Sequence, residues 1–350
     1  MIVLGLMIQN DALLVANQLG IPFQVIDLSK EYKEKIVDYM FSEYQGGRTP
    51  NPDILCNREI KFDVFLKAAM GLGADFVATG HYCQKIQHKD GSFGLIAGKD
   101  STKDQSYFLC QISQEQLSKA LFPIGKYLKS EVREIASKIG LITAEKKDSQ
   151  GLCFVGKISL PTFLQQQLKA KKGKVIEIPN DNPKLVEYHQ IEPVLANLEK
   201  LAKPFKFNEN EGTSVAEHEG AHFYTIGQRK GLHFGGRPEH YFVVQIDVEN
   251  NLIFSGQTDQ HLALNRWALF IQEKNIHYLN PNEKFTLNKP KSLWVRIRYR
   301  QKLQKATLIL KEKGLYILFD QLQRGITPGQ FAAWYIGDEL IGSGIIDSNC

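Results

Sequence analysis

A cysteine among polar and cationic residues stands out in the segment TPNPDILCNREIKF, residues 49–62. Pro52 suits the first turn of a helix, where its missing N–H would have no helical partner, and Asn51 before it is a natural cap. Cys56 then falls about one turn into that helix, with Arg58 close behind. Because a thiol near a helix N-terminus beside cations tends toward the thiolate, Cys56 is a candidate nucleophile. The same pattern also fits a small core-filling cysteine with a solvated basic flank.

A second thiol of interest, Cys153, lies in the glycine-flanked segment KKDSQGLCFVG, residues 146–156, after two lysines. The other cysteines, Cys83, Cys110 and Cys350, have apolar or terminal surroundings and are interpreted as structural. Five widely spaced cysteines, an odd number, do not suggest a disulfide framework. The expected location is therefore the cytoplasm, where thiols are normally reduced.

The segment HEGAH, residues 218–222, matches the zinc-protease pattern H-E-x-x-H. That pattern binds zinc only on a helix, where the two histidines share a face. Here Gly220 interrupts it and the strand-like FYTIG follows, with no third ligand at a helical spacing. We therefore predict no metal site, and a zinc hydrolase is kept only as an alternative.

Two basic segments suggest an anionic partner. In WVRIRYRQK, strand alternation would place Arg296, Arg298 and Arg300 on one face, where phosphate could offset their mutual repulsion. A solvated barrel exterior explains the same pattern equally well. The turn GQRKGLHFGG, residues 227–236, is basic and glycine-rich. With a net charge of +5, the composition permits a nucleic-acid partner without requiring one.

The first 145 residues alternate between helical and strand-like patterns. Helices are predicted, among others, at 11–20, 31–47, 59–73, 113–122 and 130–140, and buried strands at 23–28 and 74–80. Such alternation predicts an α/β fold with a parallel sheet and flanking helices. Ligands of these sheets bind beyond the carboxyl ends of the strands, which makes ATGHY, residues 78–82, a candidate site.

The pattern changes after residue 149. Residues 158–172 look helical, 179–212 read as a variable insertion or mobile connector, and short strands with glycine turns from about 221 suggest small barrels. The predicted domains are a catalytic α/β domain at 1–157, a central domain at 158–255 and a C-terminal β-barrel at 256–350. No apolar run is long enough to span a membrane, and the N-terminus lacks the features of a signal peptide.

Taken together, these segments closely resemble the tRNA-specific 2-thiouridylase (MnmA/TrmU) family. The matching blocks occur in family order over nearly all of residues 11–346 and include GRTPNPDILCNREIKF, GADFVATGHY, KDQSYFL, LFPIGK, VREIA, KKDSQGLCFVG, HFYTIGQRKGL, IRYRQ and TPGQFAAWY. HEGAH falls where the family carries an HEG segment, so the family resemblance accounts for the match to the zinc-protease pattern.

The resemblance implies a fold and a reaction. The fold would be an adenine-nucleotide α-hydrolase-like domain, a central domain and a C-terminal β-barrel. ATP, with Mg²⁺, would activate the 2-oxygen of the wobble uridine (position 34) in the tRNA anticodon stem-loop by adenylation. A protein persulfide, supplied by a donor or relay protein, would then replace that oxygen with sulfur.

Residue roles follow only from matching positions in the family. Cys153 resembles the persulfide carrier, Cys56 the partner thiol that releases sulfur by forming a disulfide, and Asp53 the acid/base residue. Positions matching tRNA contacts are Asn51, Pro52, Asp53, His81, Lys103, Asp104, Gln105, Arg298, Tyr299 and Gln330. Gly80 matches a nucleotide contact, and Met7 or its neighbour Ile8 an adenine contact.

One family feature is absent from this sequence. The family's SGGVDSS phosphate loop, whose backbone N–H groups hold pyrophosphate, does not occur, and the opening MIVLGLMIQ looks like the family's second strand. The expectation from sequence is an N-terminally truncated form that binds ATP poorly. The alternative function is an inactive paralogue that keeps tRNA binding without ATP-dependent chemistry.

Overall fold

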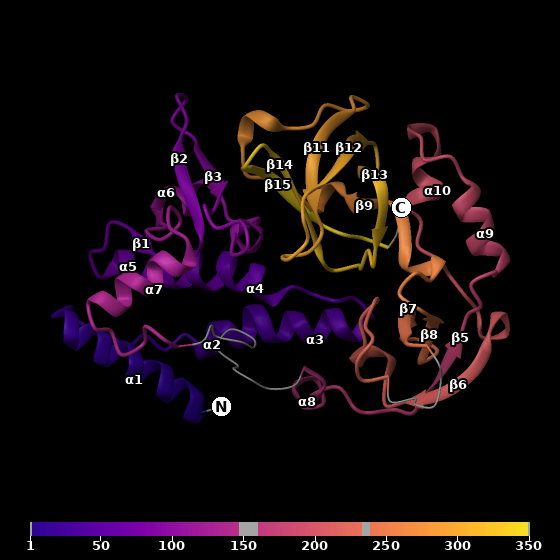
Figure 1. Ribbon diagram of the computed structural model, residues 1–350, viewed down its shortest axis with the longest axis horizontal. Helices are drawn as coiled ribbons and strands as arrows, with labels where there is room; N and C mark the ends of the chain where they lie inside the picture. The colour runs from indigo at the N-terminus through magenta and orange to yellow at the C-terminus, as the bar shows by residue number, and fades with distance from the viewer. Residues whose placement is uncertain (1, 147–159, 233–238, 349–350) are drawn as a thin grey trace. The chain divides into compact units, whose positions relative to one another are not determined.

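The structure is a computed structural model that describes residues 2–146, 160–232 and 239–348, with only the backbone for 2–7. The chain divides into two compact units (Figure 1). Unit 1 comprises Met1–Asp38, Pro52–Ser159 and Asp338–Leu340, and unit 2 comprises Tyr39–Asn51, Leu160–Gly337 and Ile341–Cys350. No helix in the described residues is long and apolar enough to cross a membrane.

Unit 1 contains a short parallel sheet with helices around it. Strand β1 (Val77–Ala78) pairs in parallel with β4 (Ala120–Leu121), so the predicted α/β class with a parallel sheet is confirmed. A hairpin of β2 (Cys83–Gln87) and β3 (Phe93–Ala97) stands beside it. The helical elements are α1 (Ile2–Leu19), α2 (Ser29–Tyr32), η1 (Lys33–Val37), α4 (Pro52–Leu55), η2 (Cys56–Val64), α5 (Phe65–Gly71), η3 (Ser106–Leu109), α6 (Gln114–Lys119) and α7 (Lys129–Lys138).

Two predicted strands are wrong. Residues 2–9 of the opening segment belong to helix α1, and residues 23–28 form no strand, with Val25 53% exposed. A helix satisfies its backbone N–H and C=O groups internally, whereas a strand depends on a neighbouring strand for them. The parallel sheet of unit 1 pairs only two residues on each strand, and the first 28 residues are not among them.

The helix that carries Asp53 and Cys56 changes its winding at Cys56. It runs without interruption through α4, η2 and α5, and η2 is a π-helix. At its end the N–H of Phe65 donates to the carbonyl of Ile60, five residues back. π-Helical turns are rare and occur often at functional sites. The predicted helix start at Pro52 is confirmed.

Unit 2 begins with α3 (Asp38–Gln45) and contains a four-stranded sheet in the order β6-β5-β8-β7. Its strands are β5 (Gly173–Glu177), β6 (Thr213–His218), β7 (Tyr241–Asp247) and β8 (Leu252–Gln257); only β5 and β8 are parallel. The segment 179–212 folds into α9 (Pro183–Gln190) and α10 (Leu198–Ala202), and Leu185 and Leu201 are fully buried. The interpretation of this segment as a mobile connector is therefore wrong.

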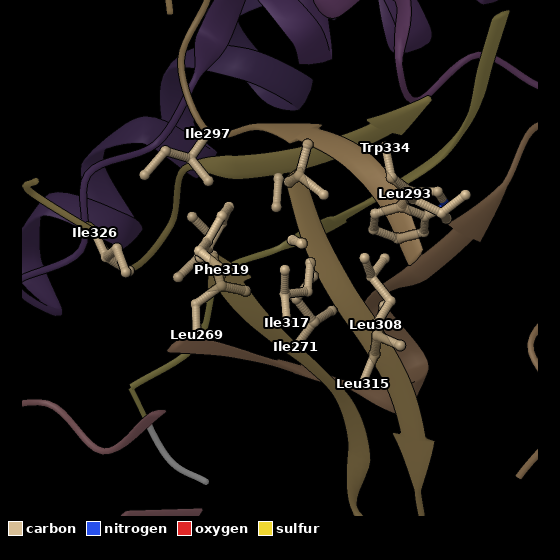
Figure 2. Close-up of a cluster of buried hydrophobic side chains, with 14 of the residues drawn as sticks. Leu269, Ile271, Leu293, Ile297, Leu308, Leu315, Ile317, Phe319, Ile326 and Trp334 are labelled. Carbon is tan, nitrogen blue, oxygen red and sulfur yellow. The ribbon is translucent and has the colours of Figure 1, made fainter. Parts of the chain in front are cut away.

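The second part of unit 2 is the predicted C-terminal antiparallel barrel. The main strands are β9 (Asn265–Gln272), β11 (Lys291–Arg296), β12 (Gln304–Lys311), β13 (Gly314–Arg324), β14 (Phe331–Ile336) and β15 (Glu339–Ile345), with the short β10 (Ile276–Tyr278) paired to β15. A bridge from Phe270 to Asp347 connects β9 with the residues after β15. Figure 2 shows the core, where Leu269, Ile317, Phe319 and Trp334 converge between the strands.

The remaining short elements connect these layers. They are α8 (Leu160–Leu164), η4 (Leu195–Asn197), η5 (Glu209–Glu211), η6 (Ala221–Phe223), η7 (Leu262–Leu264), η8 (Glu273–Asn275) and η9 (Pro281–Glu283).

Candidate functional site

The two predicted catalytic residues of unit 1 that the structure describes lie where α4 meets the π-helix, with Asp53 in α4 and Cys56 as the first residue of η2. Asp53 is half-buried and Cys56 is fully buried. The nearest cation in sequence, Arg58, is already engaged, because its Nε donates to Glu59 (2.7 Å) and its Nη1 to Gln111 (2.8 Å). The burial of Cys56 agrees with the core-filling interpretation of this thiol, and its chemical role stays a prediction.

The loop containing Lys103, Asp104 and Gln105 is shaped by two of its own side chains. The buried carboxylate of Asp104 accepts hydrogen bonds from the N–H of Gly98 (3.1 Å) and from the N–H and hydroxyl of Ser106 (both 3.0 Å). The backbone of Tyr82 is held from both sides, since its N–H donates to the Gln105 side chain (3.0 Å) and its carbonyl accepts from the Gln105 N–H (2.9 Å). Asp104 and Gln105 therefore fix the loop on which half-buried Lys103 stands.

His81 is a buried neutral imidazole. Its Nδ1 lies 2.7 Å from the Thr79 hydroxyl, and its ring packs against Phe62 and Phe122, each with a centroid separation of 6.3 Å. Burial, followed by the charge of Lys61, lowers the pKa of His81 to about 3. His81 is therefore uncharged near neutral pH and cannot contribute a cation to an RNA phosphate.

Gly80, at the carboxyl end of β1, leaves open space above the sheet. It is exposed, and a Cβ added to it would meet only Ile124 Cδ1, at 3.9 Å. Nothing in the surrounding protein therefore requires glycine at this position. A residue without a side chain at the end of a parallel strand fits close approach of a nucleotide, as predicted for Gly80.

Unit 2 brings together predicted tRNA-contacting residues from distant parts of the sequence. The Gln330 side-chain amide donates to the carbonyls of Thr49 (3.0 Å) and Pro50 (3.1 Å), and its oxygen accepts from Asn51 (3.5 Å). The Thr49 N–H donates to the Pro328 carbonyl at 2.9 Å. Segment 49–51, which precedes α4, is therefore held against the loop 325–330.

Gly329 makes this close approach possible. Its φ is +90°, and an added Cβ would lie 2.8 Å from the Thr49 carbonyl oxygen. Both the backbone conformation and the space therefore require glycine at this position.

Two further contacts extend this arrangement to four segments. The Thr49 hydroxyl donates to the Thr225 hydroxyl (3.2 Å), and Arg298 Nη2 donates to the Gly325 carbonyl (2.6 Å). The same guanidinium packs against Gly227, where an added Cβ would lie 3.7 Å from Nη2. Segments 49–51, 225–228, 298–299 and 325–330 thus form a closed circuit of contacts, which we call the four-segment ring.

The predicted row of three arginines on one strand face is wrong. Strand β11 ends at Arg296, which is buried, with its Nε donating to the Tyr335 hydroxyl (3.0 Å) and its guanidinium 4.8 Å from that ring's centroid. Arg298 and Arg300 are exposed. Because the chain leaves the strand after Arg296, the alternation that would have placed the three together does not continue.

The zinc-like segment is not a helix. His218 ends strand β6, Gly220 has a φ of +146°, and His222 lies in the one-turn helix η6. The His218 Nδ1 accepts the Gly220 N–H at 2.9 Å. Within the described residues, no group of three metal-ligating side chains exists. The zinc-hydrolase alternative therefore lacks the helix that it requires.

The structure gathers Asn51, Arg298 and Gln330 in one ring, with Tyr299 next to Arg298 in the same segment. Sequence reasoning missed the contacts that close this ring, made by Thr49, Thr225, Gly227, Gly325 and Gly329. The three glycines have positive φ, and the glycine turns in GQRKG and TPGQ were the available signal. Cys153 and the side chain of Met7 lie outside the described residues.

Three family models match the chain. Residues 8–157 match the tRNA methyl transferase HUP domain, residues 200–257 the tRNA methyl transferase PRC-barrel domain, and residues 270–346 the aminomethyltransferase beta-barrel domain. These ranges include the parallel sheet of unit 1, much of the four-stranded sheet of unit 2 and most of the barrel.

Curated relatives match over almost the whole chain. The tRNA-specific 2-thiouridylase MnmA of Christiangramia forsetii is 54% identical and that of Flavobacterium johnsoniae 55% identical, each over 96% of this chain and 86% of the relative. The MnmA of Karelsulcia muelleri is 44% identical over the same shares. Identity at this level over nearly the full length places the chain in the tRNA-specific 2-thiouridylase MnmA family.

Proposed function

We propose that this protein is a tRNA-uridine 2-sulfurtransferase, which replaces the 2-oxygen of the wobble uridine of tRNA with sulfur from a protein persulfide. The observation that carries the proposal is the four-segment ring. Asn51 and Gln330, both matching tRNA contacts of the family, meet there across 279 positions of sequence, and Arg298 belongs to the same ring. The family membership supplies the reaction.

Three residues carry the chemistry in this proposal. Cys153 holds the persulfide, and its terminal sulfur bonds to C2 of the uridine as the bond from C2 to the adenylated oxygen breaks and that oxygen leaves with AMP. Cys56 then attacks the inner sulfur of Cys153, which breaks the S–S bond, leaves one sulfur on the base and forms a Cys56–Cys153 disulfide. Two electrons from a thiol reductant restore both thiols. Asp53 moves protons during the exchange.

ATP use fits both the HUP domain and the family. When bound, ATP supplies an activated leaving group on the 2-oxygen, and Mg²⁺ would accompany its phosphates. Gly80 is the described residue that would lie against the nucleotide, because it leaves space at the end of β1. A persulfide-donating protein and a cytoplasmic location complete the proposal.

The proposal is tested by incorporation of labelled sulfur into tRNA by the 350-residue chain. We expect 2-thiouridine in digested tRNA only when ATP, a persulfide donor and the chain are all present. An unmodified transcript whose wobble base is cytidine is the matched control and should remain unlabelled. If folded chain binds tRNA with no incorporation, the protein is instead a tRNA-binding paralogue without the chemistry, and the proposal fails.

Replacing Gln330 by alanine is expected to weaken the hold on segment 49–51. The carbonyls of Thr49 and Pro50 lose their side-chain donor, which costs about 1–3 kcal/mol for each carbonyl that stays buried. We expect a lower melting temperature and at least about tenfold slower thiolation, since each 1.4 kcal/mol corresponds to a factor of ten. Gln304→Ala is the control, because that side chain bonds only to the nearby Lys302 carbonyl. Equal rates in the two variants would contradict the role given to Gln330.

A further inference from the structure

The turn 225–231, with the sequence TIGQRKG, holds its backbone with its own glutamine side chain. The Gln228 oxygen accepts the N–H of Thr225 (3.1 Å), and the Gln228 amide donates to the carbonyl of Lys230 (2.8 Å). One side chain therefore ties the backbone on both sides of Arg229. This bracing reduces the conformational freedom of the turn and fixes where Arg229 and Lys230 leave it.

The same turn is also tied to the neighbouring strand β7. The Gly227 N–H donates to the Val243 carbonyl (2.7 Å), and the Val243 N–H donates back to the Gln228 carbonyl (3.0 Å). Gly227 has a φ of +83°, a conformation that favours glycine. The turn is thus a fixed extension of the four-stranded sheet.

Arg229 and Lys230 project from this fixed turn as exposed cations. Both are exposed, and neither forms an ion pair with any carboxylate in the part of the chain that the structure describes. By contrast, Arg48 of unit 2 is paired with carboxylates, since it contacts Glu43 (2.8 Å) and Asp347 (3.6 Å). Adjacent exposed cations on a fixed backbone, without acidic partners, suit an external polyanion.

The turn adjoins the residues predicted to contact tRNA. Thr225 bonds to Thr49, and Gly227 packs against the guanidinium of Arg298, so the turn is one of the segments of the four-segment ring. None of the residues assigned to tRNA by family resemblance lies in it. Its two cations therefore extend the same surface by a segment that had no assigned role.

We propose that Arg229 and Lys230 bind the phosphate backbone of the tRNA, next to the contacts made through Arg298. The contacts would supply affinity and orientation without reading sequence, as phosphate contacts do. This assignment rests on the proposed function, because it takes tRNA as the substrate. It adds to that function a binding element outside the reacting groups.

The test is the salt dependence of tRNA binding. Each lost phosphate contact lowers the slope of log K against log salt by about 0.7 to 0.9. For the double variant Arg229→Ala/Lys230→Ala, we expect the magnitude of this slope to fall by about 1 to 2. We also expect the variant to bind tRNA at least about tenfold more weakly at low salt.

Two matched variants keep the test specific. Lys311→Ala/Lys313→Ala removes the same charge from the end of β12 and the turn that leads into β13, and should leave the slope unchanged. Arg229→Lys/Lys230→Arg preserves the charge and should retain nearly the wild-type slope. Equal melting temperatures of the alanine variant and wild type would show that the turn is still folded. If the melting temperature of the alanine variant is lower, the slope of the charge-preserving variant decides whether charge or folding is responsible.

Three results would overturn the assignment. If wild type binds tRNA and the alanine variant keeps its slope, the assignment alone is wrong. If tRNA affinity is unchanged but transfer from the persulfide donor slows, the turn binds a protein and not RNA. If wild type binds no tRNA at all, the proposed function fails, and this assignment fails with it.

Discussion

Replacing Cys56 by alanine is expected to lower sulfur incorporation into tRNA by at least about 10³-fold, because the thiol is the group that releases sulfur from Cys153. The same loss is expected for Cys153→Ser. Binding of tRNA should persist in both variants, since neither thiol belongs to the four-segment ring. The measurement is single-turnover incorporation of labelled sulfur, with tRNA affinity determined in parallel.

Cys110→Ala is the matched control for Cys56→Ala. Both thiols have 0% exposed area, so both substitutions remove a buried sulfur and leave a similar small void. Comparable losses of stability but activity loss only for Cys56→Ala would separate chemistry from packing. If Cys110→Ala is equally inactive, or Cys56→Ala is active, Cys56 is only the core-filling residue that its burial suggests.

Asp53→Asn is expected to slow thiolation by about 10²- to 10⁴-fold, the usual contribution of a general acid or base. The amide keeps the size of the carboxylate but cannot exchange a proton at neutral pH. The measurement is the single-turnover rate of thiolation at saturating tRNA.

Asp63→Asn provides the comparison on the same continuous helix. Its carboxylate pairs with Lys67 (2.5 Å) and Lys35 (3.4 Å), which lower its pKa against the opposing effect of burial, and it has no predicted part in the reaction. Activity close to wild type is expected. An unchanged rate for Asp53→Asn would show that proton transfer depends on another group.

Local signals in the sequence predicted local structure well. Pro52 marked the start of α4, and the helix predicted at 113–122 begins as α6 with a capping box between Ser113 and Gln116, with bonds of 3.1 and 2.9 Å. These features depend on neighbours within one turn, so the sequence alone contains them. The opening strand failed for the opposite reason, since a strand requires a partner and a helix does not.

The ring could not have been predicted from periodicity. The side-chain bonds that hold segment 49–51 join it to residues 176 to 281 positions away, and no spacing rule relates such residues. Family resemblance supplied Asn51, Arg298 and Gln330 as separate positions, but not their mutual contacts. The end of β11 at Arg296 could not be predicted either, because the alternating residue pattern continues in the sequence after the strand has ended.

The contact between Gln330 and Thr49 also bears on the order of events during synthesis. A ribosome makes the chain from its N-terminus at roughly 5–20 residues per second. Once Asn51 has been added, 279 further additions are needed before Gln330, which holds segment 49–51, is made. By that rate, the wait is about 14 to 56 seconds. Nascent chains that still lack the barrel cannot complete the ring, so tRNA engagement through it begins only when synthesis is nearly finished.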